Sequence, residues 1–151
     1  KPYRVLRKIY SVDGVEPDWV RFTYGTLAYL IEGSHHNPLS ATIRRRAVSA
    51  NRPTWKTLFR RLLKGPGIHG HVRDPDGNPL EAQVRILEQV LKQGERWRSR
   101  VRDGRFDRVV PVAGTYTLEV SLPGYSTLRK QVTVQGSPTA VELVLQPLEG
   151  R

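Results

Sequence analysis

The sequence contains no cysteine, which excludes disulfide bonds and thiolate metal sites and makes the chain compatible with oxidising and reducing compartments alike. It also has no apolar run near the roughly 18 to 20 residues that a membrane span needs, and no signal-peptide pattern opens it. Because the chain begins at Lys1 in sequence that already looks structured, we expect it to be part of a longer protein. The missing signal pattern therefore says nothing about the compartment.

Acidic residues are scarce in the first part of the chain. Residues 1–65 hold 13 Lys and Arg against 4 Asp and Glu, whereas residues 66–151 hold 12 against 10. The basic residues of the first part lack the interleaved aromatic side chains on which single-stranded bases stack. We therefore expect this surface to face solvent or a protein partner, and nucleic acid is not the expected partner.

A glycine- and proline-rich break, KGPGIHG at residues 64–70, divides the chain. Just before it, five apolar residues follow the spacing i, i+3, i+4, i+7 and i+8: Trp55, Leu58, Phe59, Leu62 and Leu63. This spacing predicts an amphipathic helix that starts near Asn51 or Thr54, with Pro53 in its first turn. Gly65 ends the helix, and the apolar stripe is expected to pack against another part of the protein.

After the break, the apolar period changes from 3.6 to 2. The alternating apolar residues are Tyr116, Leu118, Val120 and Leu122, followed near the end by Val141, Leu143 and Leu145. The turn signals DPDGNP, RDGR, VAGT and LPGY occur at the short, regular spacing that is typical of an antiparallel sandwich. The sequence therefore predicts a small all-β domain over residues 66–148, in which LEQVLKQGERW is a strand end followed by a loop.

The first 65 residues show a different pattern. Residues 27–31 are apolar at odd and even positions alike, which predicts a strand covered on both faces of an α/β sheet. A short helix over WVRFTYG, capped by Asp18 and ended by Gly25, is expected before it. The strand ends at Glu32, in the place where open α/β sheets bind ligands. Glu32 is therefore interpreted either as a general base or as a structural ion pair at a strand end.

Two stretches resemble a known family of enzymes. The segment IYSVDGVEPDWVRFTYGTLAYLIEG, residues 9–33, resembles the closing part of the catalytic domain of zinc metallocarboxypeptidases. The stretch NRPTWKTLFRRLLKGPGIHGHVRDPDGNPLEAQV, together with GTYTLEVSLPGY, is similar to the passage in which carboxypeptidases of the D/E/N/M regulatory group leave their last helix and enter a transthyretin-like β-sandwich. The resemblance implies an α/β fragment over residues 1–65, the end of the catalytic domain, followed by an all-β antiparallel sandwich over residues 66–148.

The resemblance also implies roles for individual residues. Glu32 takes the place of the general base, and Tyr10 takes the place of the tyrosine that folds over the substrate terminus. Pro17 lies where the family recognises the side chain being removed, and with Glu16 beside it matches neither an aliphatic nor a clearly basic preference. The chain also departs from the family after Glu32, where EGSHHNP replaces the usual Glu-Leu.

The resemblance implies a zinc-dependent hydrolase that removes C-terminal residues from peptides or proteins. The family's zinc ligands, an HxxE pair and a later histidine, are expected upstream of this chain, as are the groups that hold the substrate carboxylate. The implied partners are peptide or protein C-termini and the remainder of the catalytic domain, and the implied location is extracytoplasmic, either secreted or periplasmic. The alternative is a stand-alone sandwich that acts as a binding module through a basic docking surface.

The four histidines give no metal site in this interpretation. His35 and His36 are adjacent and are expected on the loop after Glu32. His69 and His71 share a strand face, but no carboxylate or third histidine is expected on that face. The sequence therefore assigns no metal ligand within the chain.

One run of arginines alternates with mostly apolar residues. It consists of Arg96, Arg98, Arg100 and Arg102. This alternation predicts a strand with four guanidinium groups on one face. The face is interpreted either as a docking surface for an acidic partner, a lipid headgroup or nucleic acid, or as a plain solvated face.

Overall fold

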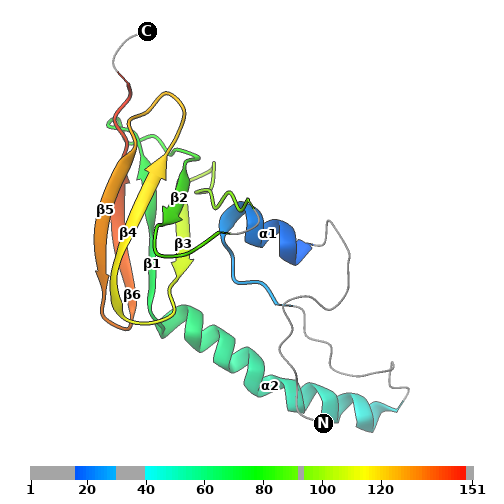
Figure 1. Ribbon diagram of the computed structural model, residues 1–151. Coiled ribbons are helices and arrows are strands. Elements are labelled where there is room, and N and C mark those ends of the chain that lie inside the picture. The colour runs from blue at the N-terminus through cyan, green and yellow to red at the C-terminus, as the bar shows by residue number, and fades with distance from the viewer. Residues whose placement is uncertain (1–15, 30–39, 92–93, 149–151) are drawn as a thin grey trace.

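The computed structural model describes residues 16–29, 40–91 and 94–148. Within these ranges the chain forms two helices followed by six strands. The elements are α1 (Glu16–Tyr24), α2 (Ala41–Lys64), β1 (Gly67–Arg73), β2 (Gln83–Ile86), β3 (Arg105–Val109), β4 (Gly114–Ser121), β5 (Leu128–Val134) and β6 (Pro138–Val144). Figure 1 shows the strands gathered in one body, with α1 lying beside it and α2 extending away from it.

The strands form two three-stranded sheets. One sheet has the order β3-β1-β6 and the other has the order β2-β4-β5. All neighbouring strands are antiparallel except β1 and β6, which run parallel from the pair Gly67 and Pro138 to the pair Arg73 and Val144. The predicted β-sandwich is therefore confirmed, with one parallel pair that the turn pattern did not predict.

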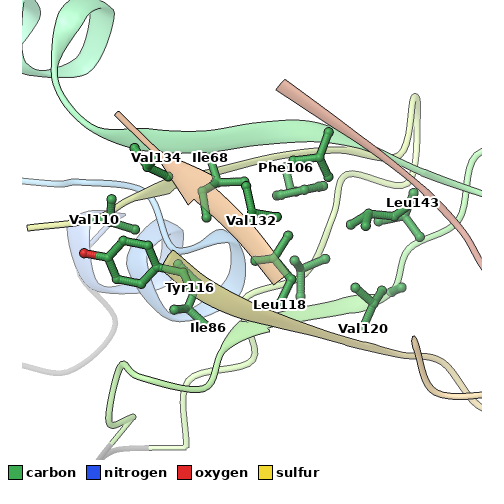
Figure 2. Packing of buried hydrophobic residues seen from close by; sticks show 14 of the residues in the cluster. Ile68, Ile86, Phe106, Val110, Tyr116, Leu118, Val120, Val132, Val134 and Leu143 are labelled. Carbon is green, nitrogen blue, oxygen red and sulfur yellow. The ribbon is translucent and has the colours of Figure 1, made fainter. Parts of the chain in front are cut away.

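The core of the sandwich lies between the two sheets, as Figure 2 shows. The predicted alternation is correct: Tyr116, Leu118 and Val120 of β4 are buried, as are Val141 and Leu143 of β6. Each fully buried side chain of this size contributes roughly 1.5–3 kcal/mol relative to an exposed one. The buried residues of β4 and β6, at every second position, thus identify the inner faces of the two sheets.

Gly70 lies at the middle of β1, opposite Phe106 of β3 and Val141 of β6. A Cβ atom at this position would lie 1.7 Å from the backbone oxygen of Val141. A backbone oxygen held in the hydrogen-bonded ladder between β1 and β6 cannot move aside as a flexible side chain can. The close approach of β1 and β6 therefore requires glycine here.

The helix before the break is longer than the sequence predicted. It begins at Ala41 and contains Pro53 in its interior, instead of starting near Asn51 or Thr54. The extra turns consist largely of alanine and arginine, which favour helix, so the helix forms there without an apolar stripe. Its predicted end is correct, because Gly65 is the C-cap. No helix among the described residues is both long and apolar enough to cross a membrane.

The α/β sheet predicted for residues 1–65 is not found in the described part of that region, which is helical or irregular. The short helix is present but begins at Glu16 rather than after Asp18, and it ends as predicted at Gly25, which has a φ of 71°. Residues 27–29 form no strand, and Tyr29 is 51% exposed. An isolated strand is not stable without neighbours, and no described strand pairs with this segment. Residues 30 and 31 lie outside the described ranges.

The predicted strand over residues 96–102 is wrong. Trp97 has a φ of 43°, which interrupts the period of 2, and residues 101–103 form a turn. The arginines are therefore not aligned on one strand face. Their ion pairs in this region are Arg98 with Glu81, and Arg100 and Arg102 with Asp103.

Candidate functional site

The residues that the resemblance assigned to catalysis are only partly within the described structure. Glu32 and Tyr10 lie outside it, as do His35 and His36. Pro17 lies in the first turn of α1 and is half-buried. The structure therefore does not test whether these side chains meet, and their roles stay predictions.

His69 and His71 lie on β1, and neighbouring strands place carboxylates beside them. The Nδ1 atom of His71 is 3.0 Å from Oε1 of Glu142 on β6, and Asp107 of β3 is paired with His69. The expectation that this face lacks carboxylates was wrong, because cross-strand partners cannot be read from one strand's sequence. Even so, the described ranges hold no group of three or more His, Cys, Asp or Glu residues that could bind a metal ion. The described residues therefore do not provide the ligand set for the zinc ion that the resemblance implies.

The most unusual group of residues lies where α1 meets the sandwich. The last carbonyl groups of a helix have no partner within the helix. Here the backbone N–H groups of Arg96 and Trp97 donate to the carbonyl of Phe22, at 2.8 and 3.1 Å, and that of Arg98 donates to Thr23 at 2.6 Å. The segment before β3 thus caps the C-terminal end of α1, which anchors the helix to the sandwich.

Arg108 of β3 completes this cap from inside the sandwich. The residue is 2% exposed, and its Nη1 donates to the carbonyl of Tyr24 at 2.7 Å. Its Nε donates to the carbonyl of Val84 at 3.0 Å, and its Nη2 to that of Trp97 at 2.5 Å. One guanidinium therefore joins α1, β2 and the segment before β3.

The charge of Arg108 is held in an apolar environment. Its guanidinium carbon lies 5.4 Å from the centre of the Trp97 ring and 5.7 Å from that of Phe106, which allows cation–π attraction. Burial lowers the pKa of Arg108 to about 9, and the charge of Asp107 opposes this shift. The group therefore remains a cation at neutral pH. The negative end of the α1 dipole favours a cation at this place.

Gly25, directly after α1, packs against the same residues. A Cβ atom on Gly25 would lie 3.1 Å from Cδ2 of Trp97 and 3.3 Å from Nη1 of Arg108. Among the described residues, Trp97 alone combines a side chain with a positive φ, and its Nε1 is buried without a hydrogen-bond partner. The junction between α1 and the sandwich thus brings together the strained Trp97, the buried cation of Arg108 and Gly25.

A cavity of about 370 Å³ adjoins this junction. Its wall includes Thr26, Leu27, Gln89, Trp97, Arg108 and Pro111. The buried Oε1 of Gln89 has no partner, whereas its Nε2 donates to the carbonyl of Val109. Because Thr26 and Leu27 share this wall with residues of the sandwich, the segment that continues from α1 follows the surface of the sandwich.

One feature of the sequence indicates that Arg108 is buried. Phe106, Arg108 and Val110 alternate with exposed or half-buried residues, and all three are buried. An arginine in the inward register of a strand is a buried cation, and buried cations need partners. The partners themselves are distant in sequence, so no local pattern identified them.

The family model for the carboxypeptidase regulatory-like domain matches residues 67–146. This range contains every strand of the sandwich and covers more than half of the chain. The chain belongs to this family. The regulatory-like domain thus accounts for the sandwich, and the match does not include α1 and α2.

Two solved structures are similar to part of the chain. The 3-chlorocatechol 1,2-dioxygenase from Rhodococcus opacus is 13% identical over 56% of this chain and 61% of that one, with a TM-score of 0.41. A type II cohesin–X-dockerin complex from Acetivibrio cellulolyticus is 14% identical over 54% of this chain and 57% of that one, with a TM-score of 0.37. The chain spans less than two thirds of each, and neither similarity supports a conclusion about function.

Proposed function

We propose that the chain is the C-terminal portion of a zinc-dependent carboxypeptidase that removes C-terminal residues from peptides or proteins. The observation that supports this most is the docking of α1 on the regulatory-like domain. Helix α1 belongs to residues 9–33, which resemble the end of a carboxypeptidase catalytic domain, and its last carbonyl groups are capped by residues 96–98 and Arg108. A catalytic segment and its accessory domain would be joined in this way.

Within this proposal, Glu32 accepts a proton from the attacking water and returns it to the leaving amine. Tyr10 closes over the substrate terminus, and Pro17 contributes to the surface beside the side chain that is removed. Zinc would be held by residues outside this chain. The enzyme would act outside the cytoplasm, in a secreted or periplasmic location.

The exposed apolar surface of helix α2 also indicates a partner outside the described residues. None of its side chains is buried, and its apolar stripe is bare: Trp55 is 47%, Phe59 59% and Leu62 43% exposed. Figure 1 shows that the helix extends away from the sandwich. Contiguous exposed apolar surface usually marks an interface. We propose that the remainder of the catalytic domain packs against this stripe.

For the alternative function, a stand-alone module with a basic docking surface, the face of four arginines over residues 96–102 offers no support. The strand that would have aligned four arginines is absent, and Arg98, Arg100 and Arg102 are paired with acidic residues. Exposed ion pairs of this kind reduce the attraction for a further acidic partner.

The chain alone is expected to bind no stoichiometric zinc and to release no residue from peptide C-termini. The longer protein that contains it is expected to bind zinc and to release residues from peptide C-termini. Mass spectrometry of peptide substrates after incubation and elemental analysis of the two proteins would measure this. Peptidase activity with bound zinc in the isolated chain, or an inactive longer protein, would contradict the proposal.

Phe59→Ala distinguishes a bare surface from an interface. In the isolated chain it should change the free energy of unfolding by less than about 0.5 kcal/mol, because the ring is already exposed. In the longer protein it should cost about 3–5 kcal/mol, the usual effect of deleting a buried Phe ring. Denaturant unfolding of both proteins gives the two values, with Thr57→Ala on the same helix as the control. Equal effects in the two proteins would show that the stripe has no partner.

A further inference from the structure

Arg108 is a buried cation that forms no ion pair with the described acidic residues. The residue is 2% exposed. Its guanidinium donates to the carbonyl groups of Tyr24, Val84, Trp97 and Asp107. The carboxylate of Asp107 pairs instead with Arg105. Carbonyl oxygens and the C-terminal end of the α1 dipole carry only partial negative charge, whereas buried charges are usually fully paired. The site therefore favours an added anion.

The cavity beside this junction has two donors available on its wall. Arg108 and Trp97 both line it. The Nη2 atom of Arg108 bears two N–H groups and has one acceptor among the described residues, the Trp97 carbonyl. The indole Nε1 of Trp97 is buried and has no acceptor in that part of the chain. Buried donors without an acceptor are rare in native proteins. An acceptor inside the cavity would satisfy both.

The other wall residues limit the charge and the chemistry of a ligand. Arg21, from the last turn of α1, is exposed, and Glu95 is 7% exposed. With Arg108 they leave one positive charge in excess, which a monoanion neutralises and a dianion would exceed. The apolar part of the wall consists of Leu27, Val90, Leu91, Val109 and Pro111. An anion with an apolar body matches this wall.

The positions of the polar groups favour a carboxylate at one side of the cavity. The guanidinium carbon of Arg108 lies 5.4 Å from the centre of the Trp97 ring, so the two oxygens of one carboxylate can accept from both residues. The unpartnered Oε1 of Gln89 is an acceptor and does not attract an anion. The carboxylate is therefore expected beside Arg108 and Trp97, and the apolar body elsewhere in the cavity. The volume of about 370 Å³ suits a small molecule.

We propose that the cavity between α1 and the sandwich binds a small monocarboxylate with an apolar body. One carboxylate oxygen accepts from Nη2 of Arg108 and the other from Nε1 of Trp97. Arg21 adds attraction from its exposed position, and the apolar body packs against Leu27 and Val109. The proposed carboxypeptidase activity is not needed for this site, because every residue in it belongs to α1, the segment after it or the sandwich.

Phenylacetate is the probe, and phenylacetamide is its uncharged counterpart of nearly equal shape. Nitrogen–proton correlation NMR of the 151-residue chain observes the site directly, because the chain has three tryptophans and Trp97→Phe identifies one indole signal. Phenylacetate should bind with a Kd of about 1 mM or below and move the Trp97 indole proton downfield as it gains an acceptor. Phenylacetamide should bind about tenfold more weakly or worse, because hydrogen bonds to a charged group are stronger. The exposed indoles of Trp19 and Trp55 should not move.

Three arginine variants locate the charge that attracts the probe. Arg108→Gln should weaken phenylacetate binding by about tenfold or more and remove its preference over phenylacetamide. Arg21→Gln should weaken binding by about two- to fivefold, since an exposed charge contributes less. Arg52→Gln removes the same charge from exposed α2, outside the wall, and should leave the Kd unchanged. Circular dichroism checks each fold, and Arg21→Gln with the phenylacetamide comparison decides the matter if Arg108→Gln does not fold.

Three results would overturn the site. The first is a Trp97 indole signal that does not move at about 10 mM phenylacetate, ten times the expected Kd. The second is equal binding of phenylacetate and phenylacetamide by the parent chain. The third is an equal weakening of binding in Arg21→Gln and Arg52→Gln, which would indicate attraction by the net charge alone. Arg108 would in each case be only a structural cap for α1.

Discussion

Under the proposed function, replacing Glu32 by glutamine in the longer protein is expected to lower kcat for release of C-terminal residues by about 10²–10⁴-fold. The amide is nearly the same size as the carboxylate, so packing and zinc content should stay close to those of the parent. It cannot accept the proton of the attacking water, and this loss removes general-base assistance. The measurement is kcat together with zinc content for variant and parent.

Tyr10→Phe is the matched comparison for this variant. Under the proposed function it removes one hydroxyl group that contacts the substrate and leaves the proton acceptor Glu32 in place, so its effect on kcat should be smaller. Near-parental kcat in Glu32→Gln would refute the assignment. Glu32 would then return to the alternative that the sequence left open, a structural ion pair.

Gly70→Ala is expected to reduce the free energy of unfolding of the sandwich by about 3 kcal/mol, the upper end of the usual cost of overpacking. The added methyl group would overlap the Val141 carbonyl oxygen, so β1 and β6 would have to separate. That loss is a large share of the roughly 5–15 kcal/mol by which a domain is usually stable. Urea unfolding of the chain, followed by circular dichroism, would measure it.

Gly114→Ala provides the control for this experiment. Gly114 begins β4 with an ordinary φ, and its nearest atom to an added Cβ is a Tyr116 ring carbon at 3.8 Å. The substitution should change stability by no more than about 1 kcal/mol. If Gly70→Ala were as mild as this control, the close approach of β1 and β6 would not depend on glycine.

The sandwich could be predicted from the sequence because its determinants are local. Each strand displays its inward residues at every second position, as Tyr116, Leu118 and Val120 do, and glycine and proline mark the turns. The end of α2 at Gly65 was equally local. Its start was missed because helix propensity, not an apolar stripe, extends it to Ala41.

The junction could not be predicted because its contacts join distant parts of the chain. Tyr24 and Arg108 are separated by 84 positions, and nothing near either residue specifies the other. The same holds for the strand expected over residues 96–102. There, alternation indicated an extended chain, but the requirement to cap α1 places Trp97 in a left-handed conformation.

The parallel pair of β1 and β6 affects how the domain is made. The first strand of the sandwich pairs along its whole length with the last, from Gly67 beside Pro138 to Arg73 beside Val144. During synthesis, β1 cannot complete its sheet until the final strand has left the ribosome, and pairing across such a separation is intrinsically slow. Until that moment one edge of β1 stays open to other chains, so the six-stranded domain assembles only when its C-terminal end arrives.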